Sequence, residues 1–225
     1  MEKVTVANLT DPPYAVEEAV NRLRINVSFL REDIKKIMVV STLPNEGKSF
    51  VSMHLWRQMA LAGTKAVLVD MDLRKSVMVE EYGIAPEKGK LTKGTSHYLS
   101  GAAGIGEVTC RTDLAEGDLI PNVENVVNPS ILLEGGRLGE LLGHLGENYR
   151  YVLVDSPPLD LVSDGERIGN LCDGAVLVVR GGVTPKGLIK HSMMQLERAG
   201  CPVLGIVLNR VGGQGSGYYY KRYGG

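Results

Sequence analysis

Residues 36–49 read KIMVVSTLPNEGKS, and this stretch decides the fold class. Its first half is mostly apolar or β-branched and predicts a buried strand, and a helical pattern begins at Gly47. The loop between them matches GxxxxGK[ST], with Thr42 in the place of the first glycine. In that motif the loop amides and the helix N-terminus enclose phosphate groups. Lys48 is then expected to reach the β- and γ-phosphates of a nucleotide, and the Ser49 hydroxyl to bind Mg²⁺.

The alternation of short apolar runs and helical patterns continues along the chain. Further strands are predicted at 66–69, 151–154, 175–179 and 203–208, and helices at 47–61, 132–146, 165–171 and 185–198. Continuous apolar strands that alternate with helices are typical of a parallel sheet covered on both faces. We therefore expect an α/β, doubly wound, mostly parallel fold of the P-loop NTPase type in a single domain.

Four segments lie outside this alternation. A helix with an apolar stripe is predicted at 14–31 and belongs to no βαβ unit, so it packs at the rim of the domain or against another subunit. Residues 75–116 have weak periodicity and are interpreted as an insertion that contains short helices. We predict an N-terminal arm at 1–13, one domain at 14–211, and a flexible glycine-rich tail at 212–225.

Composition excludes several classes of protein. The 225 residues include 25 Lys+Arg and 26 Asp+Glu, a formal net charge of −1, which gives no basic surface for nucleic acid or an anionic membrane. The apolar runs are far shorter than the roughly 18 residues that a membrane helix needs, and the N-terminus has no secretory-type apolar stretch. Three scattered cysteines suit a reducing compartment. We expect a cytoplasmic protein.

Acidic residues follow two more of the predicted strands. Asp70 and Asp72 end the run VLVDMD, and Asp155 begins DSPP after the run VLV. The carboxyl ends of parallel strands are where such sheets bind ligands. A carboxylate there can hold a Mg²⁺-bound water or accept the proton of an attacking hydroxyl. A single strand-end Asp is more often a turn residue, but three of them beside a phosphate loop predict a Mg·nucleotide site.

Two further residues have open roles in this site. Arg74 either steadies a phosphate or pairs with a neighbouring acid. Asn209, at the end of the last predicted strand, either contacts the adenine or is a simple turn residue.

Four of the nine tyrosines, Tyr218, Tyr219, Tyr220 and Tyr223, fall within the last eight residues. They are either an aromatic end that docks on the domain or a substrate cluster on a tether. A glycine-rich tether of roughly nine residues reaches about 15–18 Å, enough to visit the site of an abutting subunit. Phosphorylation of all four would add on the order of −6 to −8 charges, which we expect to drive subunits apart.

These motifs together resemble the bacterial tyrosine kinases (BY-kinases) of capsular and exopolysaccharide systems. The resemblance runs from about residue 14 to the C-terminus and includes Asn128-Pro129-Ser130, Asp164 and the tyrosine cluster. It implies an ATP- and Mg²⁺-dependent protein-tyrosine kinase that phosphorylates its own tail between the subunits of a ring. Lys48 and Ser49 carry over as Walker A, Asp70 and Asp72 as Walker A′, and Asp155 as Walker B.

The expected site residues fall into groups. The catalytic residues are Lys48, Asp70, Asp72 and Asp155, and the metal ligands are Ser49, Asp70 and Asp155. The nucleotide-binding residues are Thr42, Pro44, Asn45, Glu46, Gly47, Lys48, Ser49, Phe50, Arg74 and Asn209. The phosphoacceptors are Tyr218, Tyr219, Tyr220 and Tyr223.

The resemblance also implies partners. The family's N-terminal helix carries an E-x-x-R-x-x-R pattern that contacts the next subunit; here Glu18 and Arg24 match it, Asn21 does not, and Arg22 is offset by one residue. Glu18 and Arg22 are also spaced as an ordinary intrahelical pair. We expect oligomer contacts at Glu18, Arg22 and Arg24, a membrane-embedded activator that recruits the chain to the inner face of the plasma membrane, protein tyrosine substrates and no nucleic acid.

The main alternative is a nucleotide-switch ATPase of the partition or septum-site type, which transfers no phosphate to protein. That class carries a second lysine just after the first position of the phosphate loop, where this chain has Leu43. A non-catalytic relative is a third alternative, but it would require a broken motif.

Overall fold

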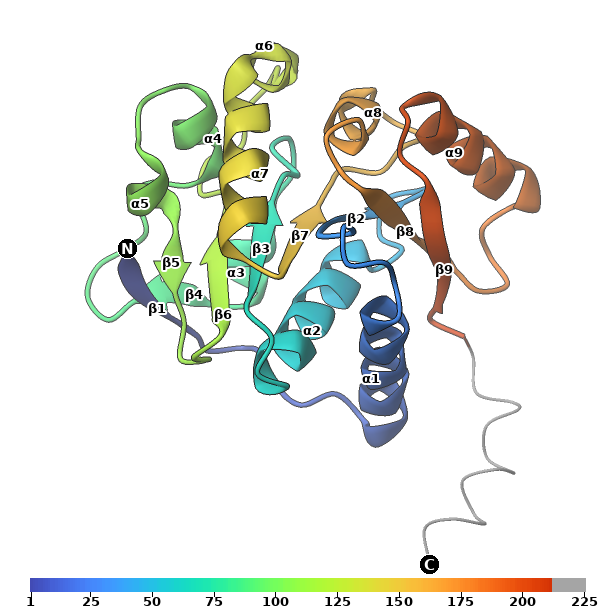
Figure 1. Ribbon diagram of the computed structural model, residues 1–225, viewed down its shortest axis with the longest axis horizontal. Helices are drawn as coiled ribbons and strands as arrows, with labels where there is room; N and C mark the ends of the chain where they lie inside the picture. The colour runs from blue at the N-terminus through green and yellow to red at the C-terminus, as the bar shows by residue number, and fades with distance from the viewer. Residues whose placement is uncertain (212–225) are drawn as a thin grey trace, which may run out of the picture.

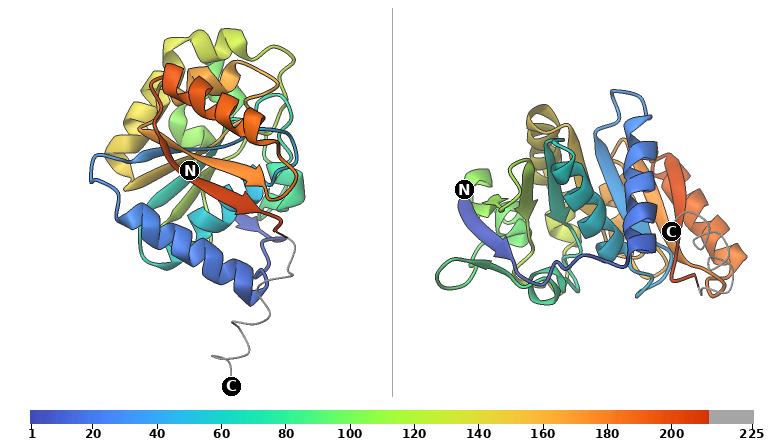
Figure 2. Two further views of the ribbon diagram at one scale, coloured as in Figure 1. Left: turned by 90° about the vertical axis from the view of Figure 1, so that its right-hand side faces the viewer. Right: turned by 90° about the horizontal axis from the view of Figure 1, so that it is seen from below.

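The computed structural model describes residues 1–211. Within them one nine-stranded sheet, in the order β4-β1-β5-β6-β3-β7-β2-β8-β9, runs through the molecule with helices on both faces (Figures 1 and 2). Six neighbouring strands are parallel: β6 (Gly117–Ile120), β3 (Ala66–Asp70), β7 (Tyr151–Asp155), β2 (Lys36–Ser41), β8 (Gly174–Arg180) and β9 (Val203–Asn209). The predicted doubly wound α/β fold is confirmed.

The central strands are buried on both sides because their apolar residues contribute alternately to two core layers. Met38 and Val40 of β2 pack with α7 (Gly136–Asn148), α8 (Asp164–Gly169) and α9 (Lys186–Arg198). Ile37 packs on the other face with α1 (Tyr14–Ser28) and α2 (Lys48–Leu61). The sheet therefore holds its carboxyl-end loops on a rigid, two-sided core.

One edge of the sheet has a different construction from the prediction. Residues 2–6 of the predicted arm form β1 (Glu2–Val6), which pairs with β4 (Ile84–Pro86) and β5 (Cys110–Arg111). The segment 75–116 thus supplies strands as well as the short helices α3 (Met78–Glu81), α4 (Thr95–Leu99) and α5 (Ile105–Val108). The helix predicted at 132–146 is divided into α6 (Ser130–Glu134) and α7, which meet at Gly135.

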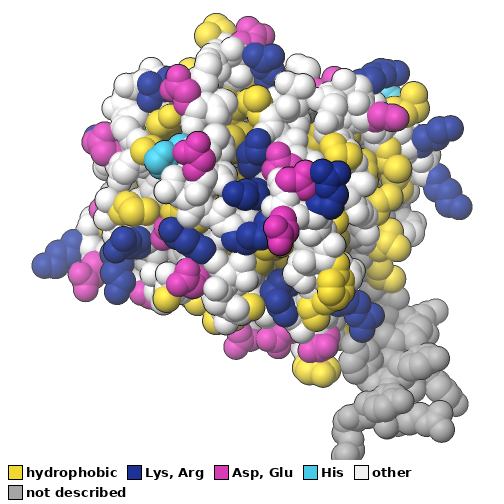
Figure 3. All heavy atoms as spheres, in the orientation of Figure 1, with side chains coloured by type: hydrophobic (Ala, Val, Ile, Leu, Met, Phe, Trp, Pro, Cys, Tyr) yellow, Lys and Arg dark blue, Asp and Glu magenta, His cyan; other side chains and the backbone are white. Residues whose placement is uncertain are grey.

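Surface chemistry agrees with the balanced composition. On the face shown in Figure 3, acidic and basic side chains are interspersed. Across residues 1–211, none of the helices combines the length and the apolar character that a bilayer crossing requires. The tail at 212–225, with its four tyrosines, lies outside the described residues.

Candidate active site

Three of the predicted motifs meet at the carboxyl edge of the central strands. The phosphate loop connects β2 to α2, and β7 lies between β2 and β3 in the sheet. Asp70 and Asp155 end β3 and β7 and are register partners. Strand order alone therefore brings the loop and both acidic strand ends to one place, as the motif positions predicted.

The phosphate loop has a backbone that only a few residues can adopt. Gly47 has φ +92° and Asn45 has φ 62°. A Cβ atom on Gly47 would lie 2.1 Å from Asn209 Nδ2, which donates a hydrogen bond to the Glu46 carbonyl at 2.8 Å. The glycine is thus required both for its left-handed conformation and for the close approach of β9.

Gly47→Ala is expected to weaken ADP binding by on the order of tenfold or more, because the new methyl group displaces Asn209 and strains the loop. Gly63→Ala is the matched control, since Gly63 also has positive φ but nothing lies within 4 Å of its added Cβ. Calorimetric titration with Mg·ADP measures the effect. Equal affinities for the two variants would contradict the steric role of Gly47.

A cluster of buried charges lies behind the loop. Lys48 Nζ is 3.0 Å from Asp72 Oδ2 and 3.8 Å from Asp155 Oδ2. Asp155 accepts hydrogen bonds from the Ser49 hydroxyl at 2.6 Å and the Ser52 hydroxyl at 3.0 Å. The structure brings together the Lys and the acids that the motifs predicted, and it adds Ser52, one turn along α2 from Ser49.

Asp70 lies behind this cluster rather than in it. It accepts hydrogen bonds from the Ser76 hydroxyl and, at 3.1 Å, from the Asp72 amide. Burial and the neighbouring Asp155 raise the pKa of Asp70 to about 7. Asp70 is 1% exposed and Asp72 is 7% exposed, and only Asp72 of the two lines the cleft.

The cluster carries more negative than positive groups. Burial raises the pKa of Asp155 above its usual range, although Lys48 opposes the shift. Burial alone would lower the pKa of Lys48, but attraction to Asp155 and Asp72 outweighs it and the pKa is raised. One ammonium group thus faces two carboxyl groups in the cluster, and Asp70 lies behind them.

This imbalance predicts a pH-dependent stability for the nucleotide-free protein. The pKa of Asp70 is about 7 in the folded chain and 3.8 is its ordinary value, so the unfolded state loses this proton first as pH rises. The contribution of Asp70 to the free energy of unfolding should therefore fall between about pH 4 and pH 7, by up to about 1.4 kcal/mol per pH unit, and level off above.

Asp70→Asn removes that titration. We expect its stability relative to the unsubstituted chain to rise with pH up to about 7 and then to stay constant. Urea unfolding of both proteins at pH 5, 6, 7 and 8 without nucleotide measures the difference. A stability difference that does not change with pH would show that Asp70 is ionised throughout.

The oxygen atoms at the site fit a magnesium ion held together with a nucleotide. The Ser49 hydroxyl and the Asp155 carboxylate are adjacent hard oxygen ligands. Residues 1–211 contain no group of three or more His, Cys, Asp or Glu side chains that would hold a metal ion by themselves. Mg²⁺ in nucleotide sites is typically bound by one or two protein oxygens, with phosphate and water completing its shell.

A cleft of about 910 Å³ opens over the loop. One end is polar and includes Lys48, Ser49, Asp72 and Arg74. The other end is apolar and lies between α1 and β9; its lining includes Ala15, Val16, Ala19, Leu23, Val207 and Val211. Among the predicted nucleotide-binding residues, Pro44, Asn45, Gly47, Phe50 and Asn209 also line the cleft. A polar end beside an apolar end suits a phosphorylated, aromatic ligand.

The other predicted residues of the loop do not line the cleft. Thr42 is buried, and its hydroxyl oxygen accepts a hydrogen bond from Ser192 of α9 at 3.2 Å. Glu46 is buried with its carboxylate toward β8. Sequence motifs mark both as loop residues but do not reveal which way their side chains point.

Arg74 forms an ion pair with a neighbouring acid. Its Nε and Nη2 atoms donate to the two carboxylate oxygens of buried Asp164, at 2.6 and 3.0 Å. This bidentate pair ties the segment after β3 to the start of α8. The ion-pair role is the one present here, and Arg74 still borders the cleft.

In the N-terminal helix α1, Asn21 occupies the position where the family's pattern has an arginine. Arg24 Nε and Nη2 both donate to Asn21 Oδ1, at 3.1 and 2.9 Å. Within the described part of the chain no ion pair joins Glu18 to Arg22. Asn21 thus holds Arg24 along its own helix.

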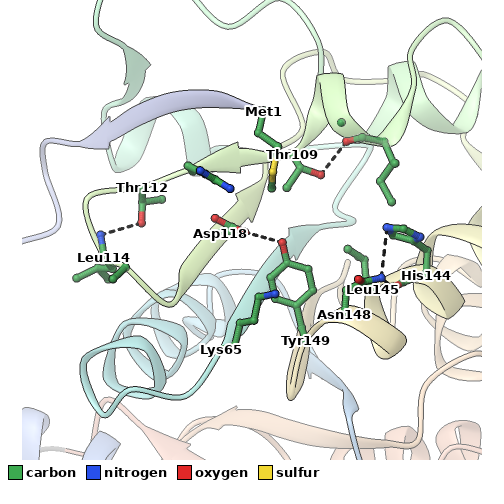
Figure 4. A pocket seen from close by; sticks show the side chains of 14 residues that line it. Met1, Lys65, Thr109, Thr112, Leu114, Asp118, His144, Leu145, Asn148 and Tyr149 are labelled. Atoms are coloured by element: carbon green, nitrogen blue, oxygen red, sulfur yellow. Dashed lines mark hydrogen bonds between the residues drawn. The ribbon is translucent and has the colours of Figure 1, made fainter.

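A second cavity, of about 590 Å³, lies away from these motifs and is shown in Figure 4. Tyr149 donates a hydrogen bond to Asp118, and Lys65 lies over the Tyr149 ring with its Nζ 5.0 Å from the ring centroid. None of the predicted site residues lines this cavity. The cleft over the phosphate loop therefore remains the candidate active site.

Comparison with known proteins agrees with this geometry. The family model of the CobQ/CobB/MinD/ParA nucleotide binding domain matches residues 37–222. Tyrosine-protein kinase CpsD of Streptococcus agalactiae serotype III (strain NEM316) is 34% identical over 195 residues, which cover 87% of this chain and 82% of that protein. Tyrosine-protein kinase etk of Escherichia coli (strain K12) is 31% identical over 203 residues, which cover 89% of this chain and 27% of that longer protein.

Among solved structures, a tyrosine-kinase domain matches this chain more closely than a septum-site ATPase does. The kinase domain of Escherichia coli tyrosine kinase ETK superimposes with a TM-score of 0.81 and 30% identity, covering 89% of this chain and 77% of that domain. The septum site-determining protein MinD of Pyrococcus horikoshii, complexed with Mg-ADP, gives a TM-score of 0.66 and 23% identity, covering 80% and 71%, and shares the fold alone. The chain belongs to the family of bacterial tyrosine-protein kinases built on this nucleotide-binding domain.

Proposed function

We propose that this chain transfers the γ-phosphoryl group of ATP to tyrosine hydroxyls, including those of its own tail. The observation that carries the proposal is the cluster of Lys48, Asp72 and Asp155 behind one phosphate loop, in a chain of the tyrosine-kinase family. The switch-ATPase alternative is supported only by distant structures, and Leu43 stands where that class has its second lysine.

ATP would lie along the cleft from its polar to its apolar end. The loop amides and Lys48 would hold the phosphates, and Ser49 and Asp155 would hold the magnesium ion, which neutralises phosphate charge when bound. Asn209, beside Gly47 at the middle of the cleft, would orient the adenine toward the wall formed by α1 and β9.

Asp72 is the group best placed to accept the tyrosine proton. A tyrosine hydroxyl has a pKa near 10 and is a poor nucleophile at pH 7 until that proton can leave. Asp72 lines the cleft, whereas Asp70 lies behind it. When Lys48 turns to the phosphates, Asp72 loses its ion pair and is free to act as the base. The tyrosine oxygen then bonds to the γ-phosphorus, the bond to the β-phosphate oxygen breaks, and ADP leaves.

The acceptors in this proposal are Tyr218, Tyr219, Tyr220 and Tyr223. Val211, the last described residue, lines the cleft, so the tail begins beside the site. By family resemblance, each subunit of a ring phosphorylates the tail of its neighbour. Glu18, Arg22 and Arg24 of α1 would lie at the contact between subunits. Resemblance also supports a membrane-embedded activator, a location at the inner face of the plasma membrane, and a role in capsular or exopolysaccharide synthesis.

Mixing a chain that lacks activity with a chain that lacks the tail tyrosines tests transfer between subunits. One chain carries Lys48→Met with an intact tail, and the other has an active site but its four tail tyrosines changed to Phe. We expect phosphate on the Lys48→Met chain in the mixture, at a rate that rises with protein concentration, by intact-mass spectrometry. An unmodified Lys48→Met chain, with a self-modifying unsubstituted chain alongside, would show that transfer occurs within one subunit.

A further inference from the structure

Glu46 is an acid within the phosphate loop that the chemistry above does not use. It is 3% exposed, and its side chain points away from the cleft toward the end of β8. Its carboxylate accepts hydrogen bonds from the Leu43 amide at 2.8 Å, the Arg180 amide at 3.2 Å and the Thr184 hydroxyl. Three donors thus compensate a buried carboxylate that has no basic side chain as an ion-pair partner in residues 1–211.

These bonds connect parts of the chain that are far apart in sequence. The Leu43 bond closes the loop on itself, and the Arg180 and Thr184 bonds anchor it to the β8–α9 connection. The main chain of Glu46 is held as well, because its carbonyl accepts the Asn209 amide from β9. Glu46 is therefore fixed from two neighbouring strand ends.

The loop needs such anchors because both neighbours of Glu46 have a left-handed backbone, and one of them is not a glycine. Asn45 has φ 62° and Gly47 has φ 92°. A non-glycine residue such as Asn45 is disfavoured in the left-handed region and persists there where the surroundings determine its conformation. Neither Glu46 nor the partners of its carboxylate, Arg180 and Thr184, line the cleft, so these bonds shape the loop without occupying the place of the phosphates.

We propose that Glu46 is a positioning residue that holds the phosphate loop in its nucleotide-binding shape before the nucleotide arrives. The proposal rests on the proposed function, since it requires that the loop bind a nucleotide. A preformed loop avoids the ordering cost of binding. Loss of Glu46 should therefore raise the Kd for ADP and the KM for ATP, with a much smaller effect on kcat at saturating ATP.

Three substitutions test this inference. Glu46→Ala removes all the carboxylate bonds, Glu46→Gln keeps the shape but loses the charge, and Thr184→Val removes one donor. We expect the Kd for Mg·ADP, by calorimetry, to rise about 10- to 100-fold for Glu46→Ala and several-fold for the other two. Glu140→Ala, on the exposed face of α7, is the control and should bind as the unsubstituted chain does.

A double-mutant cycle separates positioning through these bonds from general damage. Because Thr184 would act on the loop through Glu46, Thr184→Val should have no further effect on the Kd in the Glu46→Ala background. Hydrogen exchange at the Leu43 amide should accelerate in both Glu46 variants. If Glu46→Ala fails to fold, Glu46→Gln and Thr184→Val carry the same test.

The outcomes are distinguishable. If the unsubstituted chain does not bind ADP, the proposed function fails. If it binds ADP and all three variants bind equally well, the inference is overturned. Additive losses in the cycle, or equal losses in kcat and affinity, would also overturn it, because they would show that Glu46 does not act by ordering the loop.

Discussion

Lys48→Met is expected to lower the rate of phosphate transfer to tyrosine by on the order of 10³ or more. Within residues 1–211, Lys48 is the one ammonium group paired with Asp72 and Asp155, and it is the group that would follow the charge developing on the transferred phosphoryl group. Quantifying phosphotyrosine over time at saturating Mg·ATP measures the effect. Transfer within tenfold of the unsubstituted chain would exclude the proposed role.

A measurement of stability must accompany the assay of this variant. Removing Lys48 leaves two buried carboxylates without their counter-charge, which itself costs stability. Urea unfolding should therefore accompany the assay, at a temperature where both proteins are folded. Lys65→Met, at a lysine that lies over Tyr149 in the second cavity, changes the same residue type away from the site and should leave the rate unchanged.

Asp72→Asn is expected to lower kcat by about 10²- to 10⁴-fold while the Kd for ADP changes only a few-fold. An asparagine cannot accept the tyrosine proton, but it still fits beside Lys48. Single-turnover measurement of phosphotyrosine with pre-bound ATP isolates this step.

Asp70→Asn is the matched comparison. The two acids are two residues apart in sequence, but Asp72 lines the cleft and Asp70 lies behind it. Asp70 does not line the cleft, so its loss should lower kcat less than the loss of Asp72 does. A larger kcat defect for Asp70→Asn would reverse the assignment and make Asp70 the base.

The sequence predicted the parts of this site that depend on local pattern. The loop at 42–49 and the acids at 70, 72 and 155 each follow a buried strand, and parallel strands bring their carboxyl ends together. The main strands are continuous apolar runs between helical patterns, and this made them recognisable in the sequence. The strands β4 and β5 have only three and two residues, and β1 contains charged residues among its apolar ones, so none of them forms a continuous apolar run.

Contacts between residues far apart in the sequence could not be predicted, for a physical reason. Arg74 and Asp164 are 90 positions apart, and Glu46 and Thr184 are 138 apart. Such pairs form because the fold places β3 near α8 and β2 near β8, and no spacing rule encodes them. The left-handed backbone of Asn45 could not be predicted either, because the motif specifies Gly47 and Lys48 but not the residue at position 45.

The destination of the phosphate tests the central claim most directly. We would incubate the purified chain with Mg·ATP, follow intact mass and released inorganic phosphate together, and map the modified peptides. The account predicts a ladder of up to four phosphates within residues 218–223, absent from Lys48→Met. Stoichiometric release of inorganic phosphate with no change in protein mass would contradict it and favour a nucleotide-driven switch.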